Sequence, residues 1–176
     1  DTVIACALTA LRADNPTALT AASETIRGRF ATGALSASLA QEIRQAYAGL
    51  GRPPVAVRSS ATAEDLPDLS FAGQQDTYLH IIGDEALLAA VINCWSSLWT
   101  ARAIGYRARN GIDQQSVALA VVVQEMVAST ASGVLFTANP LNGKRREVVI
   151  DAILGLGEAL VSGQVEPDHY VVDAQG

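Results

Sequence analysis

The chain has 176 residues, of which 49% are hydrophobic, and this predicts one globular domain or two small lobes rather than a disordered segment. Its formal net charge of -6 argues against non-specific binding to nucleic acid, which needs a basic surface. A polyanionic ligand would therefore need locally concentrated positive charge or a metal ion.

The sequence pattern does not indicate a membrane protein. The longest apolar run, Val117 to Val123, is too short to span a bilayer, and no basic segment of the kind found in signal peptides precedes the apolar start. Cys6 and Cys94 stand far apart in helical patterns, which predicts two buried free thiols in a reducing compartment. We therefore expect a cytoplasmic protein. The start at Asp1, in a pattern typical of mid-helix, predicts an excised fragment.

Residues 1–54 are predicted to form helices that cover a sheet. Asn15 is a suitable N-cap with Pro16 at the first helical position. Ser36 or Ser38 can cap the helix that follows. This part of the chain shows no residue pattern that indicates chemistry.

From Val55 onward strands predominate in the pattern. A strand begins at Val55, another is expected between Gln75 and Ile82, and a long helix should run from Asp84 to about Asn110. Further strands are expected at residues 117–127, 133–137, 147–154 and 169–173, with a hairpin signal at Asn142-Gly143. This order predicts an α+β fold with a mostly antiparallel sheet.

The segment Val55 to Thr77, VAVRSSATAEDLPDLSFAGQQDT, has the features of an anion site. A strand-like run ends on Arg58, and a long loop of small residues closes at Gly73. A guanidinium offers forked donors to phosphate oxygens, and small residues let backbone N–H groups approach closely. On these residues alone, an arginine paired with an acidic residue of the loop at 64–68 is an equally good interpretation.

The residues Gln124, Glu125, Met126 and Val127 follow a very apolar strand. Such a strand end can face an adenine, because backbone groups can bind the edge of the base while Met or Val covers its face. Taken alone, the segment is better explained as a strand that reaches the surface.

Other candidates for chemistry are weaker. The glycine-containing turn at 155–163 can line a phosphate site or simply turn a corner, and Asp151 with Glu158 is a common spacing for two carboxylates. His80 and His169 lie in strand patterns without a paired base nearby, so both are predicted to be structural. A complete catalytic centre is therefore not expected within this chain.

Several long runs occur in one order between Val55 and about Asp173: VAVRSSATAEDLPDLSFAGQQDT, SLWTARAIGYR, VVVQEMV, SGVLFTANP and GLGEALVSG. Together they closely resemble the N-terminal ATP-binding domain of the phosphoenolpyruvate synthase, pyruvate phosphate dikinase and rifampicin phosphotransferase family. The resemblance implies an ATP-grasp-like domain in which ATP lies between two lobes. Residues 1–54 would be its helical segment, and residues 55–176 would hold the core strands, phosphate loop and long helix.

Members of that family cleave ATP to AMP and phosphate, and the β-phosphoryl group passes through a histidine on a swivelling domain to the acceptor. The resemblance implies that Arg58 contacts the phosphates, and that Gly73 and Thr77 lie in the loop that covers them. It also implies that Gln124 lies at the adenine pocket, with the segment from Glu125 through Met126 to Val127 as a hinge.

The resemblance covers only part of the family's pattern. The lysine-containing N-terminal segment, a metal-binding glutamate, a Gln-x-Arg segment, the swivelling domain and the acceptor domain are not recognised in this sequence. ATP and Mg²⁺ are the implied cofactors, with the metal ligands outside these residues, and the chain alone is expected to be inactive.

The implied parent is more similar to rifampicin phosphotransferase, on the runs SLWTARAIGYR, SGVLFTANP and GLGEALVSGQVEPDHY. Phosphoenolpyruvate synthase is the alternative parent. A non-catalytic nucleotide-binding module is an alternative of another class.

Overall fold

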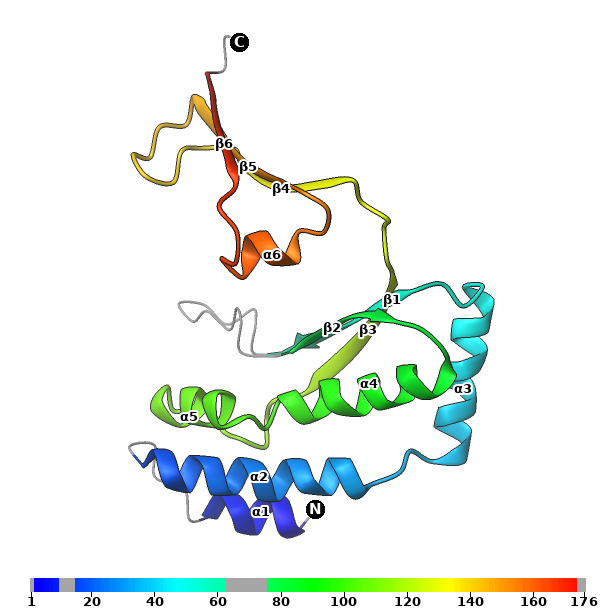
Figure 1. Ribbon diagram of the computed structural model, residues 1–176. Coiled ribbons are helices and arrows are strands. Elements are labelled where there is room, and N and C mark those ends of the chain that lie inside the picture. The colour runs from blue at the N-terminus through cyan, green and yellow to red at the C-terminus, as the bar shows by residue number, and fades with distance from the viewer. Residues whose placement is uncertain (1, 10–14, 63–75, 174–176) are drawn as a thin grey trace. The chain divides into compact units, whose positions relative to one another are not determined.

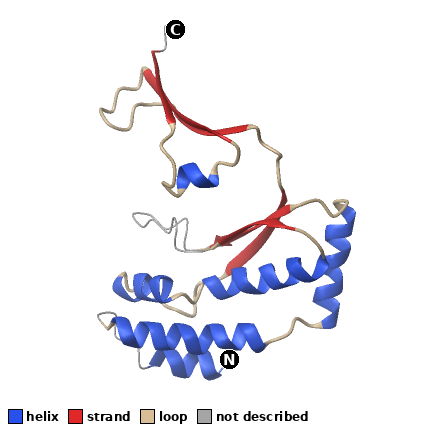
Figure 2. Cartoon of the chain, viewed as in Figure 1, coloured by secondary structure: helices blue, strands red, loops and turns tan. Residues whose placement is uncertain are grey.

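The computed structural model describes residues 2–9, 15–62 and 76–173 (Figure 1). The chain divides into two compact units, residues 1–126 and 127–176, and each is described by itself. Figure 2 shows that the first unit is mainly helical with one small sheet, and that the second is mainly strands. The α+β class predicted from the order of elements is confirmed.

The helices of the first unit are α1 (Thr2–Thr9), α2 (Pro16–Thr32), α3 (Ala37–Gly49), α4 (Asp84–Ser97) and α5 (Ala101–Arg109). Three of them, α2, α3 and α5, are preceded by residues whose side chains accept hydrogen bonds from backbone N–H groups of the first turn. Asn15 Oδ1 accepts from the N–H of Ala18 over 3.1 Å, and Ser36 Oγ accepts from the N–H of Leu39 over 3.3 Å. Both predicted N-caps are therefore confirmed.

The helical stretch predicted from Asp84 is present, and a turn at 98–100 divides it into α4 and α5. Thr100 Oγ1 accepts from the N–H of Ala103 over 3.2 Å, so this residue caps a new helix. At the start of α4 the N-cap is Gly83, at φ 92°, and Asp84 is the first helical residue. The negative charge of the Asp84 carboxylate still stabilises the N-terminus of α4 by interacting with the helix dipole.

The sheet of the first unit consists of β1 (Val55–Ala61), β2 (Thr77–Ile81) and β3 (Leu119–Glu125) in the order β2-β1-β3, with antiparallel pairs. The helix α4 packs against one face of this sheet (Figure 1). The main core lies between them, made by Tyr47, Val55, Val57, Leu87, Ala90, Val91 and Cys94. Burial of these apolar side chains holds β1 in place.

A second core lies among the helices and contains an arginine. Leu19, Ile26, Leu98, Trp99 and Ile104 form this cluster. The fully buried Arg107 donates from Nε to Gln114 Oε1 over 2.7 Å, and its guanidinium carbon lies 5.3 Å from the centre of the Trp99 ring. Burial lowers the pKa of Arg107 to about 10. Among the described residues, no hydrogen-bond partner faces Nη1 or Nη2.

Among the described residues, one helical stretch, 84–109, is long and apolar enough to cross a membrane by length and composition alone. It contains an 18-residue window with a mean hydropathy of 1.2. In the structure 61% of that window is buried inside the protein. This is the pattern of a core helix, and it agrees with the packing of α4 on the sheet.

The prediction that both thiols are buried is wrong for Cys6, which is exposed, and right for Cys94. Helix α1 packs toward the second core with Ile4, Ala7 and Leu8, which leaves Cys6 on another side of the helix. Burial raises the pKa of the Cys94 thiol to about 11.

The second unit contains β4 (Ala131–Phe136), β5 (Glu147–Leu154) and β6 (Asp168–Asp173), in the order β4-β5-β6, with antiparallel pairs. A short helix, α6 (Glu158–Val161), precedes β6. The turn between β4 and β5 holds Gly143 at φ 72°, which confirms the hairpin signal. Only Val149 and Asn139 are buried among the described residues of this unit.

Glu147 anchors the β4–β5 loop through three donors. Its carboxylate accepts from Asn139 Nδ2 at 2.8 Å, Asn142 Nδ2 at 3.1 Å and Lys144 Nζ at 2.5 Å. The hydrogen bond from Lys144 is the largest cause that lowers the pKa of Glu147 to about 2, followed by those from the two asparagines.

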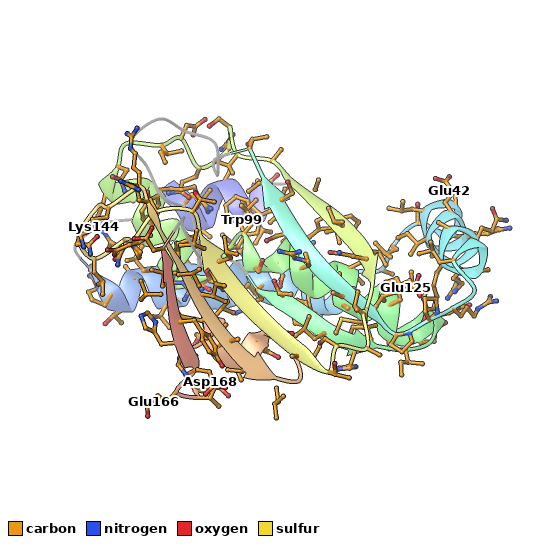
Figure 3. The ribbon with its side chains drawn as sticks, turned by 90° about the horizontal axis from the view of Figure 1, so that it is seen from above. Glu42, Trp99, Glu125, Lys144, Glu166 and Asp168 are labelled. Atoms are coloured by element: carbon orange, nitrogen blue, oxygen red, sulfur yellow. The ribbon has the colours of Figure 1, made fainter. Side chains whose placement is uncertain are left out.

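This lowered pKa predicts an acid-dependent contribution to stability. Because the folded pKa is below the ordinary value of 4.5, the contribution is complete above pH 4.5 and is lost as the pH falls toward 2. Urea unfolding between pH 2 and pH 6 should show that Glu147→Gln destabilises the chain at pH 6 and much less at pH 2. The exposed Glu166, labelled in Figure 3, provides the control Glu166→Gln. A gap between wild type and Glu147→Gln that does not change with pH would contradict this prediction.

Candidate functional site

The central strand β1 carries Arg58 on the face of the sheet opposite the main core. The prediction that the strand ends on Arg58 is wrong, since β1 continues to Ala61 and stays paired with β3. Val55 and Val57 are fully buried in that core, and side chains alternate between the two faces of a strand. Arg58 therefore points away from α4, and its side chain is exposed. The alternation, and not a special local structure, determines this orientation.

The strand register brings Thr77 and Gln124 to the same face as Arg58. Arg58 lies opposite Thr77 on β2 and opposite Val122 on β3, while Gln124 lies opposite Ala56. Residues that lie opposite one another in antiparallel strands project from the same face. We call this surface the outer face. Its exposed residues are Arg58, Ser60, Thr77, Ala120, Val122 and Gln124.

The guanidinium of Arg58 has a neutral partner on the outer face. Arg58 Nη1 donates to Gln124 Oε1 over 3.3 Å. The alternative partners predicted at 64–68 lie outside the described residues. Gln124 was not expected to touch Arg58, because 66 residues separate the two and only the pairing of β1 with β3 brings them together.

Gly73 also lies outside the described residues, whereas the remaining predicted site residues are described. Glu125, labelled in Figure 3, is exposed at the end of β3. The N–H of Met126 donates to the carbonyl of Pro54 over 2.9 Å. Val127 is 75% exposed and begins the second unit. The division of the chain into units falls between Met126 and Val127.

A shallow cavity of about 450 Å³ lies where β1 ends and β3 begins. It is lined by Ser60, Ala61, Thr62, Ala118, Leu119 and Ala120. These residues are small apart from Leu119, so the backbone is accessible to a ligand there. Thr62, which lines the cavity, is the last described residue before residue 76.

The prediction that His169 has no paired base nearby is wrong. His169 Nδ1 lies 2.6 Å from Asp151 Oδ1, and the two residues are directly opposite one another on β6 and β5. The two residues are 18 positions apart in sequence, and only the pairing of β5 with β6 brings them into contact. His80, on the exposed side of β2, has φ 56° next to an irregularity in the β1–β2 register.

The glycine turn after β5 is held by hydrogen bonds within the second unit. The N–H of Gly155 donates to the carbonyl of Thr130 over 2.9 Å, and its carbonyl accepts from Ser132 Oγ over 2.6 Å. Gly157 approaches Ser132 so closely that an added Cβ would lie 3.3 Å from the serine Cβ. These contacts within the protein are enough to explain the conformation of the turn.

No three His, Cys, Asp or Glu side chains gather as a metal site within residues 2–9, 15–62 and 76–173. Asp151 is engaged with His169.

The exposed arginine on this sheet face, beside a threonine and a glutamine, can bind an anion such as a nucleotide phosphate, because its guanidinium matches phosphate geometry. Comparison with models of known protein families specifies the ligand class further. All residues, 1–176, match the model described as "Pyruvate phosphate dikinase, AMP/ATP-binding domain". The chain belongs to this family, which confirms the resemblance seen in the sequence.

Relatives with two different names match the chain at similar identity. Phosphoenolpyruvate synthase of Pyrococcus furiosus is 52% identical over 157 residues, which cover 86% of this chain and 19% of the relative. Rifampicin phosphotransferase of Streptomyces sviceus is 53% identical over 160 residues, or 90% of this chain and 18% of the relative. Rifampicin phosphotransferase of Bacillus cereus is 59% identical over 117 residues, or 66% and 14%. The chain spans less than a fifth of the length of these proteins.

Proposed function

We propose that this chain is the ATP-binding part of a dikinase-type phosphotransferase. The parent protein would convert ATP, an acceptor and water into AMP, phosphate and the phosphorylated acceptor. The β-phosphoryl group would travel through a histidine on a swivelling domain. The observation that carries the proposal is the exposed Arg58, opposite Thr77 and bonded to Gln124, in a chain of an AMP/ATP-binding family.

The proposed roles follow the positions on the outer face. Arg58 binds the ATP phosphates and stabilises the charge that develops on them, because phosphoryl transfer needs mainly positioning and electrostatic stabilisation. Thr77, with Gly73, covers the phosphates. The resemblance implies that Gln124 lies at the adenine pocket, with residues 125–127 as the hinge beside it. Because Gln124 is bonded to Arg58, we assign the base to the hinge segment alone.

The outer face fits part of an ATP site. An exposed guanidinium can bind phosphate oxygens through two parallel hydrogen bonds. Mg²⁺ would neutralise phosphate charge when bound, and its ligands are proposed to come from other parts of the parent protein. We therefore assign no metal ligand and no metal-dependent step to the described residues.

The acceptor is proposed to be a rifamycin, with pyruvate as the alternative. The runs SLWTARAIGYR and SGVLFTANP favour the first, although relatives of both kinds match at similar identity. The partners would be the phosphohistidine domain and the acceptor domain of the parent chain. A cytoplasmic location is proposed because the reaction consumes ATP.

The nucleotide product tests this function. The full-length protein is incubated with ATP and with either rifampicin or pyruvate, and the products are separated by ion-exchange chromatography. We expect one AMP and one phosphate for each acceptor phosphorylated. ADP as the only nucleotide product would indicate an ordinary kinase. ATP binding without turnover of either acceptor would favour a non-catalytic module.

A further inference from the structure

The contact between Arg58 and Gln124 joins two residues to which the family resemblance assigns opposite ends of ATP. Gln124 is the diagonal neighbour of Arg58 on the outer face, because Ala56 lies opposite Gln124 and Arg58 lies opposite Val122. Long side chains at such diagonal positions reach one another, and here Nη1 and Oε1 are 3.3 Å apart. The sheet itself therefore places the glutamine against the guanidinium.

The chemistry of this partner suits an arginine that has to bind a phosphate. A glutamine carbonyl is neutral and occupies one N–H, whereas a guanidinium has five N–H donors. A carboxylate in the same place would neutralise the arginine and compete with phosphate for its planar fork. The amide of Gln124 orients Arg58 and leaves its charge available.

Orientation matters because the Arg58 side chain is exposed. A free arginine loses rotamer freedom when it binds a ligand, and a neighbour that already restricts it lowers this cost. The bond between two exposed side chains at 3.3 Å adds little to folding stability. Its effect should therefore be seen in ligand binding.

We propose that Gln124 is a positioning residue for Arg58, whose guanidinium it holds on the outer face in the orientation that receives the ATP phosphates. This inference rests on the proposed function, since it takes the phosphates as the ligand of Arg58. It differs from a contact of Gln124 with adenine, because positioning of Arg58 affects only ligands that carry phosphates.

The test is a double-mutant cycle on the full-length protein. Dissociation constants for ATP and for adenosine are measured by calorimetry in wild type, Gln124→Met, Arg58→Ala and the double variant. Methionine keeps the length of glutamine and removes the acceptor. We expect Gln124→Met to weaken ATP binding about fivefold to tenfold, as is usual for coupled residues in contact. Adenosine binding should stay within about twofold, and the substitution should have no effect when Arg58 is alanine.

Two further variants sharpen the result. Gln124→Glu should bind ATP more weakly than Gln124→Met, because its carboxylate pairs with the guanidinium and repels phosphate. Gln41→Met, at an exposed position of α3, is the matched control and should bind both ligands like wild type. Thermal unfolding midpoints should agree among all these variants.

The inference would be overturned if Gln124→Met weakened adenosine binding, or weakened ATP binding equally with and without Arg58. Either result would mean that Gln124 acts on the base. This result can be distinguished from a failure of the proposed function. If the wild-type protein released ADP, dikinase chemistry would be refuted, but the double-mutant cycle would still measure the coupling between Gln124 and Arg58. Failure of wild type to bind ATP would overturn both.

Discussion

Replacing Arg58 with alanine in the full-length protein is expected to lower the rate of AMP release by about 10²- to 10³-fold, the usual cost of removing one preorganised group that stabilises transition-state charge. The side chain is exposed and contributes nothing to the core, so the variant should fold normally. Product formation by chromatography and a thermal unfolding curve separate the two effects.

The geometry of the guanidinium can be tested apart from its charge. Arg58→Lys keeps a positive charge and loses the planar fork, so we expect about a tenfold to hundredfold loss of rate. Arg44→Ala is the matched control, because Arg44 is half-buried in the same unit and, among the described residues, forms its ion pair with Glu85, over 2.7 Å. It should stay within about twofold of wild type. An Arg58→Ala protein with normal AMP release would assign the chemistry to other residues.

Replacing Leu87 with alanine is expected to lower the free energy of unfolding by about 2–5 kcal/mol. Leu87 is 1% exposed and packs in the core between α4 and β1, so truncation leaves a cavity beneath the strand that carries Arg58. Urea unfolding of the chain should show a lower midpoint with little change in slope.

The control for this substitution is Leu50→Ala, at a leucine that is 49% exposed at the end of α3. It should cost about 1 kcal/mol or less, because much of its side chain is already in water. Equal destabilisation by the two substitutions would show that the core between α4 and the sheet does not dominate the stability of the first unit.

Local signals predicted much of the secondary structure. Asn15 was expected as one N-cap and either Ser36 or Ser38 as another, and Asn15 and Ser36 make the capping hydrogen bonds. The strand expected at 147–154 has these bounds in β5. The turn at 98–100 was not anticipated, because the apolar pattern continues through it and Thr100 reads as one more polar residue. Such signals act within a few residues along the chain, so the linear sequence contains them.

The candidate site was predicted in part. Arg58, Thr77 and Gln124 were identified from motif resemblance, and the structure brings all three to one face of the β2-β1-β3 sheet. Their roles toward ATP stay predictions, and Gly73 lies outside the described residues. The pairing of His169 with Asp151 was missed because the two are 18 residues apart in sequence and meet only across paired strands.

By itself, the sequence determined the family, the α+β class and the position of Arg58 within a strand, because alternation and motif order are properties of the linear chain. Only the tertiary structure decided which side chains meet. The register of β1 against β3 places Gln124 beside Arg58, and the packing of α1 leaves Cys6 exposed. Such contacts depend on how separate elements align, and no local pattern contains that alignment.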